Sequence, residues 1–154
     1  MMRFNQRWLT LEGHKFPVFQ AYIERDRVVR YLDFLGERRQ EPQGEKPQQG
    51  SVCDDIGPAL PTFAFSLEMD AGVVATMANL LQVEANCLLH GEQSFTYHSA
   101  LRCGDLVTVE SVLRDVSWKA SSHVCFFGKE SRFLVKERLV VSSRTVYAIK
   151  ATMV

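Results

Sequence analysis

Apolar residues at helical spacing are concentrated between residues 61 and 83, and most of the positions between them are apolar as well. The spaced residues are Phe63, Leu67, Val74, Met77 and Leu81. A helix that is apolar around most of its circumference has to be covered on nearly all sides. The pattern therefore predicts a long buried helix, which Gly72 either kinks or divides into two short helices in series.

After this helix the pattern changes to the alternation of apolar and polar residues that is typical of strands. The predicted strands are residues 87–98, 106–118, 121–127, 133–141 and 145–153. Turns are expected at 102–105, at 128–129 and at a polar hairpin tip formed by 142–144. A run of strands after one buried helix indicates an α+β fold, in which a curved antiparallel sheet wraps around the long central helix.

The periods of the helix and of the strands also predict which residues face each other in the core. From the sheet they are Phe95, Val107, Val109, Tyr147 and Ile149. A shorter helix is expected at 24–35, with Val28, Leu32 and Leu35 as its apolar stripe and Gly36 as its C-terminal stop.

Length and composition fit one globular domain, residues 1–154, with an ordinary apolar content of 46%. The 18 basic residues balance 18 acidic ones, which gives no global field that would favour nucleic acid or an anionic membrane. No apolar run approaches a membrane span, and the N-terminus lacks the apolar core of a secretory signal. Four cysteines without a CxxC pair indicate reduced thiols in a cytoplasmic protein; no metal site and no cofactor are expected.

Residues 37–55 form a long segment of glutamine, proline, glycine and charged residues that cannot build a core. The composition predicts a loop, and loops of this length are usually functional or disordered. Two interpretations stay open: a mobile surface excursion, or a lid over a ligand cleft.

The residues from Leu89 to Asp105 are the most recognisable part of the chain. Their sequence, LHGEQSFTYHSALRCGD, resembles the LHGEQ and Gly-Asp pattern of the MaoC-like dehydratases, in their N-terminal-domain subtype. The PTF triplet at 61–63 and the segment IERDRVVRYLDFLGE at 23–37 resemble other parts of the same proteins. The resemblance covers about residues 13–153. It implies a hot-dog fold that pairs into a double hot dog, and action on acyl thioesters of coenzyme A (acyl-CoA) or acyl carrier protein (acyl-ACP).

The family's chemistry, as the resemblance implies it, adds water to a 2-enoyl group or removes it from a 3-hydroxyacyl group. Active relatives carry an Asp and a His just after the first helix, in a Gly-Asp-x-Asn-Pro-x-His segment that activates the water. Here residues 36–43 read GERRQEPQ, in which Glu37 stands at the Asp position and no histidine is present. The resemblance therefore implies a dyad-lacking, substrate-binding chain, paired as a homodimer or with a dyad-bearing partner.

His90 and Glu92 are the catalytic candidates on this chain, because strand alternation puts both side chains on one face, where they can hydrogen-bond. In the alternative interpretation, His90 only anchors its strand to the helix. The residues expected to contact the substrate are Phe63, Gly91, Gln93, Phe95 and Tyr97. The resemblance places the acyl chain beside the central helix.

Two carboxylates, Glu68 and Asp70, lie within the predicted apolar helix. They are either solvated near an end or kink of the helix, or catalytic, since hot-dog thioesterases carry their base or nucleophile on this helix. Arginines between residues 25 and 39 either contact a coenzyme A phosphate or form a solvated helix face. A non-catalytic acyl-CoA-binding protein and a thioesterase are thus the alternatives to a hydratase or dehydratase.

Overall fold

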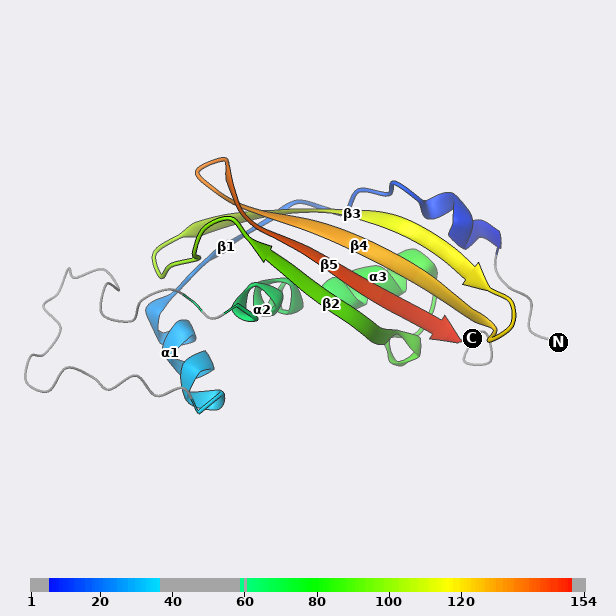
Figure 1. The fold of residues 1–154 in the computed structure, drawn as a ribbon, viewed down its shortest axis with the longest axis horizontal. Helices are drawn as coiled ribbons and strands as arrows, with labels where there is room; N and C mark the ends of the chain where they lie inside the picture. Colours follow the sequence, from blue (N-terminus) through cyan, green and yellow to red (C-terminus); the bar gives the residue numbers. More distant parts are fainter. Residues whose placement is uncertain (1–5, 37–58, 60, 151–154) are drawn as a thin grey trace, which may run out of the picture.

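The computed structural model describes residues 6–36, 59 and 61–150. The helical segments are η1 (Gln6–Leu11), α1 (Arg25–Phe34), α2 (Phe63–Asp70), α3 (Val73–Leu81) and η2 (Ala85–Cys87). The strands are β1 (Phe19–Tyr22), β2 (Leu89–Tyr97), β3 (Leu106–Lys119), β4 (Val124–Val135) and β5 (Arg138–Lys150). Figure 1 shows the strands curving over α2 and α3, with α1 near one end of the sheet, so the predicted α+β arrangement is confirmed.

Neighbouring strands of the sheet are antiparallel and follow the order β1-β3-β4-β5-β2. The segment before β1 continues along the same edge of β3. There the N–H of Gly13 donates to the carbonyl of Leu113 at 2.9 Å, and the N–H of Phe16 donates to the carbonyl of Ser111 at 3.0 Å. At the opposite edge, β2 pairs only with β5 among the described strands. The outer side of β2 is therefore an open sheet edge.

The central helix is divided, because α2 ends at Asp70 and α3 begins at Val73. Gly72 lies between them in the left-handed conformation, with a φ of 73°, which glycine adopts without a steric cost. The break changes the helical phase, so Val73 is buried, whereas the predicted core residue Val74 is only half-buried. The other predicted core residues of this stretch are confirmed as buried: Phe63, Leu67, Met77 and Leu81.

Buried apolar side chains form two clusters, one with each half of the divided helix. The first joins α2 to the sheet through Phe63, Leu67, Val107, Val109 and Phe133. The second joins α3 to the sheet and to Trp8 of η1 through Met77, Leu81, Phe127, Tyr147 and Ile149. The prediction for the sheet side of the core is confirmed, except that Phe95 is half-buried.

Strands β4 and β5 run through both of the predicted polar turns, so the turns expected at 128–129 and 142–144 are wrong. The two strands are joined instead at Lys136 and Glu137, which both have positive φ values, 50° and 64°. The polar residues of these predicted turns include Lys129 and Ser143, and both are buried strand residues. Their burial needs polar partners, because an unpaired polar group inside a protein is costly.

The first helix, α1, is buried through Val28 and Leu32, as predicted. Leu35 follows the helix and is 46% exposed, so it does not belong to the apolar stripe. Gly36 comes next with a φ of 74°, which confirms it as the helix stop. The predicted loop, 37–55, lies outside the described residues.

The described cysteines are not all reduced. Cys103 is disulfide-bonded, whereas Cys125 is a free thiol. The expectation of reduced thiols throughout is therefore wrong, and the cytoplasmic location stays a prediction that this observation does not support. Among the described residues, no helix is both long enough and apolar enough to cross a membrane.

Leu67 tests the role of α2 as the packed centre of the sheet, because its side chain is 1% exposed. Leu67→Ala should lower the free energy of unfolding by about 2–5 kcal/mol, since it leaves a cavity that the surroundings fill only in part. The matched control is Met69→Ala on the same helix, whose side chain is 43% exposed; it should cost less than about 1 kcal/mol. Urea unfolding followed by circular dichroism measures both, and equal small losses would contradict the packing described.

Candidate functional site

A groove of about 260 Å³ lies between α2 and the open edge strand β2, with α1 at one side. Its lining residues are Tyr31, Thr62, Phe65, Ser66, Met69, Asp70, Gln93 and Phe95. The Tyr31 hydroxyl donates to Thr62 Oγ1 at 2.7 Å, which joins α1 to the start of α2. The groove therefore combines apolar and aromatic walls with a few polar groups, the usual character of a small-molecule site.

A salt bridge, a hydrogen bond and a cation–π contact of Arg27 hold α1 against α2 beside this groove. Arg27 Nη2 lies 2.6 Å from Asp70 Oδ2 and donates to Ser66 Oγ at 3.1 Å. The guanidinium also lies over the Phe63 ring, 5.4 Å from its centroid. Asp70 is 66% exposed and is engaged in this pair, so the structure gives it the solvated position that was one of its two predicted alternatives.

His90 lies on the inner face of the sheet, on the side of the helix, and the residue is exposed at the open edge. Its ring lies 5.0 Å from the Phe65 ring and 5.9 Å from the Tyr147 ring, measured between centroids. The described residues place no carboxylate within hydrogen-bonding distance of the ring. This arrangement matches the anchoring interpretation of His90, and a catalytic role for it stays a prediction.

The expectation that His90 and Glu92 share a face is wrong. A bulge at Gly91 shifts the register, so that His90 lies opposite Tyr147 and Glu92 lies opposite Val146. Successive residues of β5 point to opposite faces, which puts Glu92 on the outer face of the sheet. A hydrogen-bonded His90–Glu92 pair is not formed, and Glu92 loses its geometric basis as a catalytic partner.

The predicted substrate-contacting residues are divided between the groove and the core. Gln93 and Phe95 line the groove. Gly91 forms the bulge, and Phe63 is fully buried beneath the Arg27 side chain. Tyr97 lies further along the inner face, and its buried hydroxyl has no hydrogen-bond partner among the described residues; burial raises the pKa of Tyr97 to about 12. Contact of these residues with a substrate stays a prediction.

A buried ionic cluster joins α2 to β4. Lys129 Nζ forms a salt bridge with Glu68 Oε1, and both side chains are 1% exposed. Ser131 Oγ accepts from Lys129 Nζ at 2.6 Å and donates to Glu68 Oε1 at 2.6 Å. Because a hydroxyl has one proton to donate, the Ser111 hydroxyl must be the donor in its 2.9 Å contact with Ser131 Oγ. Lys129 Nζ and Ser131 Oγ thus both bind Glu68 Oε1 and also contact each other.

The cluster belongs to a band of polar side chains that crosses the inner face of the sheet. The register aligns the band in two rows: Ser111, Ser131 and Ser143; and Lys129, Thr145 and Gln93. At the open edge, Thr145 Oγ1 donates to Gln93 Oε1 at 2.7 Å. The band lies between the two apolar clusters, at the level where the central helix breaks.

Three oxygens next to the ionic cluster are buried and have no hydrogen-bond partner in the described part of the chain: Glu68 Oε2, Ser143 Oγ and the Tyr147 hydroxyl. Burial lowers the pKa of Lys129, although the Glu68 charge and hydrogen bond act in the opposite direction. Burial raises the pKa of Tyr147, and the negative charge of Glu68 adds to the effect. Catalysis by Glu68 would require access to a side chain that is fully enclosed and bound by Lys129.

Sequence reasoning missed Lys129 because it was assigned to a turn and Ser131 because it lay between two predicted strands. Thr145 was expected only as the first residue of the strand 145–153. A signal was nevertheless present, since a carboxylate at position 68 of an apolar helix requires a buried cationic or hydroxyl partner. The described residues contain no group of His, Cys, Asp and Glu that could hold a metal ion.

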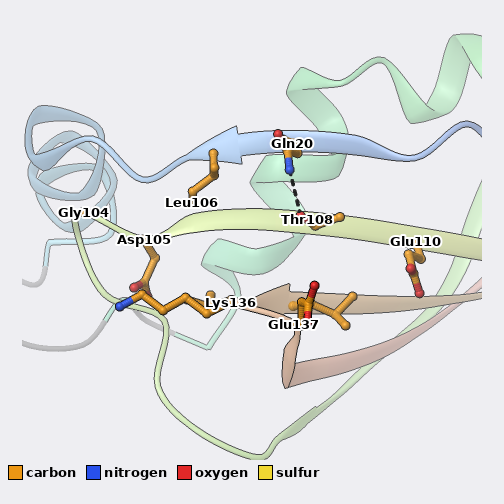
Figure 2. A pocket seen from close by; sticks show the side chains of 10 residues that line it. Gln20, Gly104, Asp105, Leu106, Thr108, Glu110, Lys136 and Glu137 are labelled. Atoms are coloured by element: carbon orange, nitrogen blue, oxygen red, sulfur yellow. Dashed lines mark hydrogen bonds between the residues drawn. The ribbon is translucent and has the colours of Figure 1, made fainter.

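A second hollow, of about 710 Å³, lies on the outer face of the sheet (Figure 2). Its side chains come from β1, β3 and the hairpin between β4 and β5; the hydrogen bond drawn across it joins Gln20 Nε2 to Thr108 Oγ1 at 3.2 Å. Asp105 on its rim accepts from the N–H of Arg102 at 2.8 Å, which confirms the predicted turn. Most of the side chains that line this hollow are polar or charged. The groove beside β2 has apolar and aromatic walls with a few polar groups, and it is therefore the better candidate site for a small molecule.

Residues 10–142 match the family described as "FAS1-like, dehydratase domain region". A UPF0336 protein of Thermobifida fusca is 27% identical over 145 residues, which cover 92% of this chain and 91% of that protein. The match to the family covers most of the chain, and it agrees with the resemblance carried by the HGEQ and Gly-Asp elements.

Solved structures share the fold. The C-terminally truncated HadBC (3R-hydroxyacyl-ACP dehydratase) complex of Mycobacterium tuberculosis gives a TM-score of 0.65 at 14% identity, covering 90% of this chain and 96% of that chain. The MaoC-like dehydratase of Rhodospirillum rubrum gives 0.59 at 14% identity, covering 90% and 92%. The predicted hot-dog fold and the MaoC-like resemblance are confirmed, and pairing into a double hot dog stays a prediction.

Tyr147 provides a pH test of the buried band. Its folded pKa is raised above the ordinary value of 10.0, so the stability gained from burying the neutral phenol is complete below about pH 10 and is lost as the pH rises further. Tyr147→Phe removes the group that ionises in the unfolded chain. Between about pH 10 and 11 the wild type should lose up to about 1.4 kcal/mol more unfolding free energy than this variant does.

Urea unfolding of both proteins over this pH range measures the difference. Tyr22→Phe is the matched control, since Tyr22 is 56% exposed, and it should follow the wild type throughout. Parallel pH curves for wild type and Tyr147→Phe would contradict the burial of a neutral phenol beside Glu68.

Proposed function

This chain belongs to the FAS1-like dehydratase domain region family, and we propose that it is a MaoC-like protein of the dyad-lacking type, which binds an acyl thioester. The thioester is a 2-enoyl or 3-hydroxyacyl group carried by coenzyme A or acyl carrier protein. Its acyl chain lies in the groove between α2 and β2. Water addition or removal then takes place only where a second hot-dog domain supplies the acid and the base.

The observation that carries this proposal is the groove itself. It runs along an open sheet edge, and Phe65, Met69 and Phe95 provide apolar walls suited to an alkyl chain. The histidine nearest to it, His90, stacks on the Phe65 ring and has no carboxylate partner among the described residues. Acid–base catalysis needs a proton acceptor within about 3 Å of the water and a second group that donates a proton. Binding without chemistry fits this site better.

The open edge of β2 supports the pairing part of the proposal. Unpaired edges of this length are normally covered or paired in proteins. Two-fold pairing through β2 would join two sheets and place the groove at the boundary between them. The HadBC dehydratase, which has the same fold, is itself a complex. We propose that this chain forms a homodimer, or a heterodimer with a hot-dog partner that carries the Asp and His dyad.

Sedimentation velocity tests the pairing. At micromolar concentration the chain of 17.5 kDa should sediment at twice that mass, or should do so after the dyad-bearing partner is added. A species that stays at the monomer mass in both conditions would refute the pairing.

The second prediction concerns turnover. The purified chain should hydrate crotonyl-CoA only slowly, because acid–base assistance is typically worth about 10²–10⁴ in rate. Loss of the enoyl absorbance measures hydration, and release of free thiol measures hydrolysis by a thioesterase. Turnover that appears only after a dyad-bearing partner is added would support the proposal.

His90→Ala and Glu92→Ala complete this experiment. Both variants should leave the slow basal rate unchanged, because His90 is stacked and Glu92 lies on the opposite face. Vigorous hydration by the wild type that is abolished in His90→Ala would overturn the dyad-lacking assignment. Thermal stabilisation by butanoyl-CoA without any turnover, even with the partner, would indicate the alternative of a binding protein alone.

A further inference from the structure

The groove beside β2 is closed on its inner side by polar groups. Gln93 forms part of its wall, and the amide oxygen of Gln93 accepts from Thr145 Oγ1 at 2.7 Å. Thr145 is itself fully buried and lies directly opposite Lys129 in the next strand. Behind the apolar groove, a ligand would therefore meet the Gln93 amide first, then the Thr145 hydroxyl, and then the Lys129 ammonium group.

The ionic cluster also spans the full distance from helix to sheet. Glu68 belongs to α2, whereas Lys129 and Ser131 belong to β4, and their direct contacts leave these three side chains enclosed. Apolar clusters lie on both sides of this contact. An alkyl chain that continued inward between α2 and the sheet would have to separate the pair, and each separated charge would lose its partner without gaining water.

The unpartnered oxygens strengthen this barrier. Glu68 Oε2, Ser143 Oγ and the Tyr147 hydroxyl are buried beside the cluster, and no described residue forms a hydrogen bond with them. Methylene groups placed against these oxygens would give them no hydrogen bond. An apolar surface in the same place would instead stabilise each methylene group that it buried. The inner end of the groove thus opposes alkyl chains by its chemistry.

We propose that Glu68 and Lys129 limit the length of the acyl chain that this protein accepts, so that it binds short acyl thioesters and excludes long-chain ones. This inference rests on the proposed function, because it concerns the same groove. The alkyl chain is covered by Phe65, Met69 and Phe95 and ends at the polar band. Further methylenes stay outside the protein and add no affinity.

The test is a series of saturated acyl-CoA ligands from butanoyl to dodecanoyl, each below its micelle concentration, titrated calorimetrically into the full chain in its native assembly. Where a chain is buried, each added methylene should raise the affinity about fourfold. The affinity of the wild type should rise in this way only for the shortest acyl chains. For longer chains, each added methylene should change the affinity by less than about twofold.

The variant that removes the barrier is Glu68→Leu combined with Lys129→Met, since replacing both members of a buried pair leaves no unpaired charge. Its affinity should continue to rise with chain length, so the ratio of its affinities for dodecanoyl-CoA and butanoyl-CoA should exceed that of the wild type at least tenfold. The matched control is Glu110→Leu with Arg132→Met. That pair, 3.1 Å apart on the outer face, is 46% and 57% exposed, so this control should follow the wild-type series.

Each outcome separates the inference from the proposed function. A wild-type affinity that rises steadily to dodecanoyl-CoA overturns the inference and leaves the proposed function intact; this measurement holds even if the double variant fails to fold. The inference is also overturned if the double variant folds and its affinity stops rising at the same chain length as that of the wild type. Absence of binding by every acyl-CoA in all three proteins contradicts the proposed function, and the inference with it.

Discussion

The salt bridge between Glu68 and Lys129 is the contact on which the arrangement of helix and sheet depends. Transfer of two charged groups into the interior costs several kcal/mol for each, and only close contact with further hydrogen bonds offsets that cost. Ser131 supplies those hydrogen bonds at 2.6 Å to each partner. Apolar side chains can repack against one another with little loss, whereas the salt bridge and hydrogen bonds of this cluster form in only one position of α2 over β4.

Several features of the fold follow from that fixed position. The polar band lies between the two apolar clusters, so α2 and α3 each pack on a cluster of their own. Gly72, in its left-handed conformation, forms the connection at which the central helix is divided into α2 and α3. With α2 fixed over β4, its other side faces the open edge strand, and the groove forms there between Phe65, Met69 and Phe95. The site is thus a consequence of where the buried charges hold the helix.

The general architecture could be predicted from local patterns. The apolar stretch around Leu67 and the alternation around Val107 and Val109 specify a buried helix and a sheet, because each pattern depends only on neighbouring residues. The residues of the polar band could not be recognised in this way. Gly128, Lys129 and Ser131 have the composition of a turn, and their burial depends on Glu68, which is 61 residues from Lys129 in the chain.

In the candidate site, too, some positions could be predicted from local patterns and others depended on pairing with distant residues. Gln93 and Phe95 were predictable as groove residues from the strand pattern together with the HGEQ resemblance. The placement of Glu92 was not, because a single extra residue at Gly91 reverses the face of everything before it relative to everything after it. A glycine inside a strand is a sign of a bulge, so Gly91 was a local signal, but the alternation of residues within β2 does not report the change of face.

A double-mutant cycle on Glu68 and Lys129 tests most directly whether their salt bridge holds the helix on the sheet. Glu68→Leu, Lys129→Met and the combined variant are compared with the wild type by urea unfolding. Each single substitution should cost about 3–5 kcal/mol, because it leaves one buried charge unpaired, and the double variant should cost much less than the sum. Costs that add to within about 0.5 kcal/mol would mean that the two side chains act independently, and would contradict this account.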